Sequence, residues 1–126
     1  MRVLVCGSRT FSDVIICSML DGIADRMLNA KSALVIITGM ARGADTIAVD
    51  WANANGITLH EYPADWERHG RRAGYLRNVE MLERGNPDLV LAFVDKPLIA
   101  SKGTAMMVNL ARRAGVKTYV VEAING

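Results

Sequence analysis

The sequence predicts one three-layer α/β domain spanning residues 1–126, in which a parallel sheet of five strands carries helices on both faces. Short apolar runs rich in β-branched residues alternate with segments whose apolar residues recur every three or four positions. These are the patterns of buried strands and of helices with one buried face. Gly56, Gly85 and Gly115 each follow such a helix and precede a strand, where a left-handed cap favours glycine. Strands that alternate with helices through short loops form a parallel sheet.

The elements follow one another without a repeat, a low-complexity stretch or a linker. The strands are predicted over residues 2–6, 33–37, 57–62, 88–94 and 117–121. The helices are predicted over residues 13 to about 29, 44 to 55, about 71 to 84, and from the loop at 95–104 to residue 114. Ser12 or Asp13 is the expected N-cap of the first helix.

The composition is that of a globular protein, with 51% hydrophobic and 22% charged residues. A formal charge of +2 is too small for a protein that binds nucleic acid through bulk electrostatics, although a local basic patch is compatible with it. Cys6 and Cys17 match neither a disulfide framework nor a metal-ligand spacing, so a reducing compartment is the default expectation. The chain opens on a predicted strand and has no run long enough to cross a membrane. We therefore expect a cytoplasmic protein without a membrane partner.

The most informative stretch is the glycine-containing turn at residues 38–45, between a predicted strand and a predicted helix. Gly39 and Gly43 allow backbone angles closed to other residues and let a ligand approach the main chain. The helix that begins here presents unpaired N–H groups, which bind phosphates and other anions. Arg42 adds a planar, permanently charged donor group, and Asp45 completes the motif. This turn is a candidate phosphate-binding loop.

Three further polar loops follow predicted strands, and all four therefore lie at the carboxyl edge of the sheet. Open parallel sheets bind their ligands along this edge, where the strand order reverses. The opposite edge carries only plain turns such as residues 30–32 and 86–87. The residues that follow the other three strands are Gly7, Ser8, Arg9 and Thr10; Asp65 and Trp66; and Ser101, Lys102, Gly103 and Thr104.

The chemistry of these loops suits a phosphorylated ligand, although several side chains have two readings. Charge could come from Arg9, Arg42, Arg71, Arg72, Arg77 and Lys102, and the arginines at 71 and 72 could equally be surface residues. Trp66 either stacks on a base or covers the rim of a helix. Asp65 either accepts from a ribose hydroxyl or caps the next segment. His69 is expected at the surface, and no catalytic triad, metal cluster or carboxylate pair is visible, so we expect neither a metal nor a cofactor.

Five motifs, taken together and in order, resemble the YspA-type branch of the SLOG superfamily over nearly the whole chain. They are Gly7-Ser8-Arg9-Thr10-Phe11, Gly39-Met40-Ala41-Arg42-Gly43-Ala44-Asp45, Ala64-Asp65-Trp66, Gly74-Tyr75-Leu76-Arg77-Asn78 and Ser101-Lys102-Gly103-Thr104. The resemblance implies a Rossmann-like sheet in the order 3-2-1-4-5 that binds nucleotides or nucleotide-derived ligands. Such a protein is expected in a bacterium or a phage.

Two related protein families bear on whether the protein hydrolyses its ligand or binds DNA. The chain is similar to the Lonely Guy phosphoribohydrolases at Arg77 and at Gly103-Thr104, but Met107 stands where their catalytic glutamate would be. A methionine can neither stabilise an oxocarbenium-like centre nor activate water, so the same hydrolysis would need Asp65 or Asp95 as a substitute. The glycine loop is also similar to that of the DNA-processing protein that loads recombinase on single strands. With seven aromatic residues and a charge of +2, nucleic acid is not the favoured partner.

The expected function is therefore binding of a nucleotide-like small molecule, as a sensor or a sequestering module. The alternative is a hydrolase that cleaves an N-glycosidic or phosphate bond, with Asp65 and Arg77 as candidate catalytic residues. A homo-oligomer is compatible with the seven methionines, which could form an adaptable interface or lie in the core. The predicted ligand-binding residues are Gly7, Ser8, Arg9, Gly39, Arg42, Gly43, Asp45, Asp65, Trp66, Arg77, Asn78, Ser101, Lys102, Gly103 and Thr104.

Overall fold

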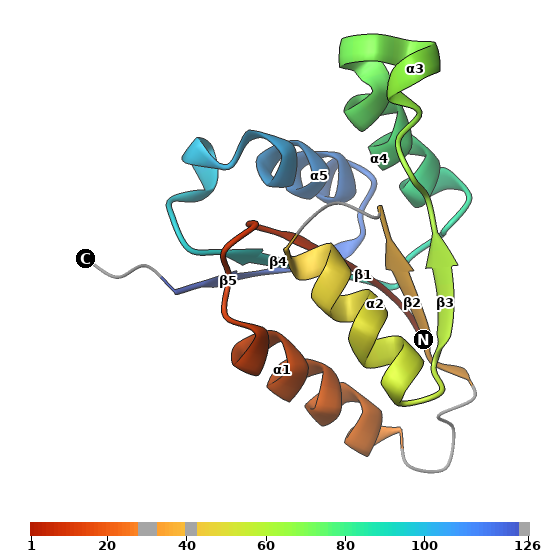
Figure 1. The fold of residues 1–126 in the computed structure, drawn as a ribbon, viewed down its shortest axis with the longest axis vertical. Helices are drawn as coiled ribbons and strands as arrows, with labels where there is room; N and C mark the ends of the chain where they lie inside the picture. The colour runs from red at the N-terminus through yellow and green to blue at the C-terminus, as the bar shows by residue number, and fades with distance from the viewer. Residues whose placement is uncertain (28–32, 40–42, 124–126) are drawn as a thin grey trace.

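The computed structural model describes residues 1–27, 33–39 and 43–123 and contains one five-stranded sheet (Figure 1). Its strands are β1 (Arg2–Gly7), β2 (Val35–Thr38), β3 (Thr58–Glu61), β4 (Leu89–Val94) and β5 (Lys117–Glu122). All neighbouring strands pair in parallel, in the order β3-β2-β1-β4-β5. The predicted fold class and strand order are confirmed.

The helices are α1 (Asp13–Arg26), α2 (Ala44–Ala54), α3 (Trp66–His69), α4 (Ala73–Glu83) and α5 (Lys102–Arg113). The helix predicted from residue 71 begins at Ala73, because the preceding segment forms the short helix α3 and a single 3-10 turn, Gly70–Arg72. Gly70 has a φ of 56°, which interrupts helical geometry between them. The last residues of the first predicted helix, 28–29, lie outside the described residues.

The helices form two layers, one on each face of the sheet (Figure 1). α1 and α2 cover one face and contact each other, whereas α4 and α5 pack together on the opposite face. The short helix α3 lies beyond the end of α4, at the top of the view in Figure 1. This arrangement leaves the carboxyl edge of the sheet bordered by loops from both layers.

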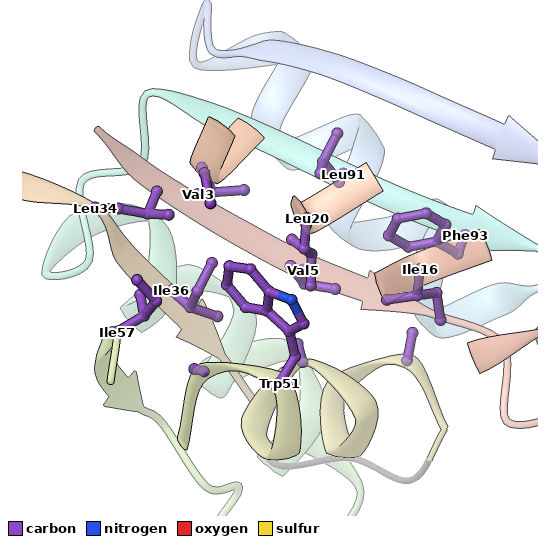
Figure 2. Close-up of a cluster of buried hydrophobic side chains, with 14 of the residues drawn as sticks. Val3, Val5, Ile16, Leu20, Leu34, Ile36, Trp51, Ile57, Leu91 and Phe93 are labelled. Atoms are coloured by element: carbon purple, nitrogen blue, oxygen red, sulfur yellow. The ribbon is translucent and has the colours of Figure 1, made fainter. Parts of the chain in front are cut away.

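The larger core lies between the sheet and helices α1 and α2. Figure 2 shows the Trp51 indole reaching from α2 towards Val5 and Ile36 of the sheet. Its Nε1 donates to Asp21 Oδ1 of α1 over 2.8 Å, so the buried N–H has a partner and the two helices are linked. Phe93 of β4 contacts Phe11 with ring centroids 5.2 Å apart. Phe11 comes directly after the loop that follows β1, so its burial in this core anchors that loop.

The second core lies beneath α4 and α5 and consists mostly of aliphatic and sulfur-containing side chains. Leu4, Ile37 and Val90 from the sheet meet Met81 of α4 and Met107 of α5. Met107 is 1% exposed, so the side chain at this position points into the core. Burial of such side chains stabilises the fold by about 1.5–3 kcal/mol each.

The pairing of β1 with β4 brings two functional loops together. Gly7 lies opposite Phe93, and the N–H of Ser8 donates to the Phe93 carbonyl oxygen over 2.8 Å. A Cβ at position 7 would lie 2.3 Å from that oxygen, so only glycine allows this approach. The loop after β1 is thereby held against the loop after β4.

Candidate functional site

A cavity of about 1120 Å³ opens at the carboxyl edge of the sheet. It is formed by the loops after β1, β2, β3 and β4 together with Trp66 of α3, Arg77 of α4 and the first turn of α5. The sequence predicted that these loops meet, and ten of the predicted ligand-binding residues line the cavity. They are Gly7, Ser8, Arg9, Gly39, Trp66, Arg77, Ser101, Lys102, Gly103 and Thr104.

The N-terminus of α5 forms one wall of the cavity. Ser101 precedes the helix, and the backbone N–H groups of its first turn have no intrahelical acceptor. Ser101 is 8% exposed, and its Oγ is buried without a hydrogen-bond partner among the described residues. A buried hydroxyl without a partner is costly. This wall therefore offers backbone donors and the positive end of a helix dipole to a ligand, and the unpartnered hydroxyl of Ser101 is buried at the same helix terminus.

Gly43 packs the turn after β2 against the loop after β1, and Ser8 and Arg9 of that loop line the cavity. Gly43 has a φ of 85°, and a Cβ there would lie 2.4 Å from Arg9 Cα and from the Ser8 carbonyl oxygen. The N–H of Ala44 donates to that same oxygen over 3.4 Å. Gly43 thus joins two loops without lining the cavity itself. Arg42, the cation predicted beside it, lies outside the described residues.

Arg77 lines the cavity from α4, but two of its donor atoms already bind the protein. Nη1 donates to the Gly39 carbonyl oxygen over 2.7 Å, and Nε donates to Asn78 Oδ1 over 2.9 Å. Asn78 is buried, so its amide orients the guanidinium and does not reach the cavity. Arg77 contributes positive charge to the site while it also holds the turn after β2 in position.

Asp45, predicted as a ligand contact, is placed inside the protein. It is 4% exposed, and its Oδ2 accepts from the Gly39 N–H over 3.0 Å and from Thr38 Oγ1 over 3.2 Å. Its carboxylate therefore shapes the start of the loop after β2 and is not among the groups that line the cavity. A carboxylate at this place satisfies a turn N–H, as capping acids commonly do.

Asp65 and Trp66 are adjacent in sequence but have different environments. Asp65 Oδ1 accepts from the Arg68 N–H over 3.0 Å and caps α3, which is the second of the two roles that the sequence left open. It does not line the cavity. Trp66 does, and 61% of its surface is exposed, so its ring is available to a flat partner such as a nucleobase.

Several lining residues were not among the predicted ligand contacts: Thr10, Pro63, Ala64, Asp95, Lys96 and Ala100. The pair formed by Thr10 and Asp95 matters most, because the Thr10 hydroxyl donates to Asp95 Oδ2. This hydrogen bond, with help from Ser8 and the charge of Lys96, holds the pKa of Asp95 below its ordinary value despite partial desolvation. The sequence placed Thr10 in the polar loop after the first strand and offered Asp95 only as a substitute for the missing glutamate, so neither was predicted as a ligand contact.

Cys6 lies beneath the site and offers no chemistry to it. Burial raises the pKa of its thiol, and the negative charge of Asp45 raises it further against the opposing charge of Arg77. A thiol that stays protonated is a poor nucleophile and a poor metal ligand. Among the described residues, no three His, Cys, Asp or Glu side chains are grouped so that they could hold a metal ion. Over the same residues, no helix is long and apolar enough to cross a membrane.

The sheet order and the cavity at its carboxyl edge define a Rossmann-like α/β domain. The profile described as the "YspA, cpYpsA-related SLOG family" matches residues 1–69. The chain is also similar to the Gene 61 protein of Mycobacterium phage D29, with 41% identity over 120 residues that cover 91% of each chain. The chain belongs to the YspA, cpYpsA-related SLOG family, as its motifs indicated. No solved structure gives a significant match.

Proposed function

We propose that this protein binds a nucleotide or a nucleotide-derived small ligand in the carboxyl-edge cavity, as a sensor or a sequestering module. Membership of the SLOG family is consistent with a nucleotide-related ligand. The observation that carries the proposal is the buried Oγ of Ser101, at the helix terminus that lines the cavity. This oxygen has no hydrogen-bond partner among the described residues. A phosphoryl oxygen at this terminus would accept from the adjoining N–H groups, and it would also give the Ser101 hydroxyl a partner once that side chain turns towards the cavity.

In this proposal the phosphoryl group lies at the first turn of α5, between Ser101 and Thr104. Lys102, Arg9 and Arg77 all line the cavity and supply positive charge around it. Trp66 stacks on the base, because its exposed ring borders the same cavity. The volume of about 1120 Å³ is above the usual range for small-molecule sites, so a ligand larger than a mononucleotide also fits.

Binding without turnover is favoured over hydrolysis. The side chain at position 107, where the related phosphoribohydrolases carry glutamate, is a methionine buried in the second core. Of the two candidate substitutes, Asp65 caps α3, whereas Asp95 lines the cavity and accepts a hydrogen bond from Thr10. The ligand-binding role of the lining residues, the cytoplasmic location and a homo-oligomer remain predictions.

Mass spectrometry of small molecules released from the gently denatured protein tests this function. We expect a nucleotide or an ADP-ribose-like species. A product-like fragment, such as free ribose phosphate, would instead support the hydrolase. If the protein is empty, calorimetric titration with a panel of nucleoside mono- and diphosphates decides the question, and a complete lack of binding would contradict the proposal.

Two variants on α5 make the titration specific to the cavity. Lys102→Ala removes a cation that lines it, and Arg112→Ala removes an exposed cation from the last turn of the same helix. Each substitution lowers the net charge by one. We expect Lys102→Ala to weaken nucleotide binding about tenfold and Arg112→Ala to leave it within about twofold. Equal effects would mean that the ligand responds only to overall charge.

A further inference from the structure

Asp95 is an acidic side chain in a cavity whose other charged groups are basic. Among the described residues, the cations that line this cavity are Arg9, Arg77, Lys96 and Lys102. A carboxylate close to a phosphoryl group repels it, and the repulsion is stronger in a partly desolvated site than in water. A phosphorylated ligand must therefore present a different part of its structure to Asp95.

The carboxylate of Asp95 is held in place by the loop after β1. Thr10 donates to its Oδ2, and the Asp95 N–H donates to Ser8 Oγ over 3.4 Å. The Thr10 hydrogen bond keeps the pKa of Asp95 below its ordinary value, so this carboxyl group is ionised at neutral pH. An ionised carboxylate only accepts hydrogen bonds, and its two oxygens have about four acceptor sites, more than Thr10, Ser8 and its own N–H occupy. The complementary ligand group is a neutral hydrogen-bond donor.

The position of Asp95 along the sheet edge distinguishes a sugar hydroxyl from an amino group of the base. Asp95 directly follows β4, and the first turn of α5 is reached within ten residues of the same strand end. Trp66 is the first residue of α3, which follows β3 directly in the chain. β3 lies three strand positions from β4 in the sheet, a separation of about 14 Å at the usual strand spacing. If the phosphoryl group lies at α5 and the base at Trp66, the part of the ligand nearest Asp95 is the sugar attached to the phosphate.

We propose that Asp95, positioned by Thr10, is a specificity residue that accepts a hydrogen bond from an unsubstituted ribose hydroxyl of the ligand. The inference rests on the proposed nucleotide-binding function and names its substrate class. The site takes ribonucleotides whose 2′- or 3′-hydroxyl is free, and it rejects deoxyribonucleotides and sugars phosphorylated at that hydroxyl. Asp95 here is a binding group and performs no bond cleavage.

Calorimetric titration of matched sugar analogues tests this inference. Each ribonucleoside 5′-diphosphate is compared with its 2′-deoxy, 3′-deoxy and 3′-phosphorylated counterparts, and inorganic pyrophosphate serves as a probe without a sugar. The wild-type protein is expected to bind the ribose form about tenfold more tightly than at least one deoxy form. It is expected to bind the 3′-phosphorylated form more weakly still, because of charge repulsion.

Asp95→Asn and Asp25→Asn are matched variants, since each removes one negative charge. Asp25 is exposed on α1, on the opposite face of the sheet from α5. We expect Asp95→Asn to reduce the preference for ribose below about threefold while pyrophosphate binding stays equal or improves. Asp25→Asn should keep the full preference for ribose. Thr10→Val should reduce the preference for ribose only partially, because it removes the hydrogen bond that positions the Asp95 carboxylate and keeps the carboxylate itself.

The outcomes separate this inference from the proposed function. Nucleotide binding that is equal for ribose and deoxyribose, or a preference that survives Asp95→Asn, would overturn the role of Asp95 and leave the binding function intact. The role of Asp95 would also be overturned if Asp95→Asn lost affinity for adenosine diphosphate but not for inosine diphosphate. Such a result would mean that Asp95 binds the amino group of the base and not a hydroxyl of the sugar. Failure of every nucleotide and of pyrophosphate to bind the wild-type protein would overturn both.

Discussion

Arg77 Nη1 donates a hydrogen bond of 2.7 Å to the carbonyl oxygen of Gly39, which ties α4 to the turn after β2. The arginine also occupies the space where a side chain at position 39 would begin, because a Cβ there would lie 2.7 Å from Arg77 Cδ. Gly39 and Arg77 are thus a matched pair. The small residue allows the guanidinium to lie over the turn, and the guanidinium adds positive charge to the cavity wall.

Gly39→Ala is expected to weaken ligand binding more than it weakens the fold. The added methyl group displaces the flexible end of Arg77, so the free energy of unfolding should fall by only about 1 kcal/mol. The displaced guanidinium should lower nucleotide affinity about tenfold. Urea denaturation and calorimetric titration measure the two effects.

Gly22→Ala is the control for that substitution. Gly22 lies in α1 with no atom within 4 Å of an added Cβ, so alanine should stabilise the helix by about 0.5–1 kcal/mol and leave binding unchanged. A Gly39→Ala protein with the affinity of the wild type would contradict the proposed role of the Gly39–Arg77 pair.

Gly43→Ala is expected to damage the fold itself. A Cβ at this position meets backbone atoms of Ser8 and Arg9 at 2.4 Å, and the φ of 85° is unfavourable for alanine. Backbone atoms held by the sheet cannot move aside as the end of an arginine can, so we expect a loss of at least about 3 kcal/mol. Thermal unfolding followed by circular dichroism checks this. A melting temperature within a few degrees of the wild type would show that the two loops are not packed as described.

The fold and the meeting of the loops were predictable, because both follow from patterns along the chain. Apolar runs that alternate with helical segments required a parallel sheet, and a parallel sheet brings every strand-following loop to one edge. The direction of individual polar side chains was not predictable. Asp45 and Asn78 lie in the motifs of the site, yet both are buried and support neighbouring groups.

The same limit applies to Asp65 and to the pair of Thr10 and Asp95. Asp65 had two physically reasonable roles, and the choice depended on the position of the Arg68 N–H, which only the three-dimensional fold determines. Thr10 and Asp95 are 85 residues apart in sequence. Their hydrogen bond arises because β1 and β4 are neighbours in the sheet, and no local pattern reports it.

Asp95 is expected to make a pH-dependent contribution to stability. Its pKa in the folded protein lies below the ordinary value of 3.8, chiefly because of the hydrogen bond from Thr10. A lowered pKa of this kind stabilises the fold above the unfolded-state pKa, and the contribution is lost as the pH falls through the folded-state pKa. The difference in stability between the wild type and Asp95→Asn should therefore be constant from about pH 7 to about pH 5 and shrink below about pH 4.

Urea midpoints measured across this pH range test that expectation. Thr10→Val removes the hydrogen-bond donor. The stability difference between the Thr10→Val protein and the Thr10→Val/Asp95→Asn protein should therefore depend little on pH. A difference that stays constant down to about pH 3 would show that the carboxylate gains nothing from Thr10.

The two thiols are expected to react slowly or not at all in the folded protein. Burial raises the pKa of Cys6, and burial together with the charges of Asp13 and Asp21 raises the pKa of Cys17, so little thiolate forms near neutral pH. Titration with a disulfide reagent should modify Cys17 slowly and leave Cys6 intact, whereas both should react in urea. A folded Cys17→Ser protein that reacts rapidly would contradict the burial of Cys6.

The most direct test of the central claim is a titration of the ¹⁵N-labelled protein with a ribonucleoside diphosphate, followed by amide chemical shifts. If the phosphoryl group lies at the first turn of α5, the largest changes should occur at Ser101–Thr104 and in the loop at Ser8–Thr10. The nucleotide should also change the amide shift of Trp66, because its base stacks there. Pyrophosphate alone should reproduce the changes at α5 and leave the Trp66 amide unchanged. Saturable binding whose largest changes lie away from this edge of the sheet, or no change with any nucleotide, would contradict the account.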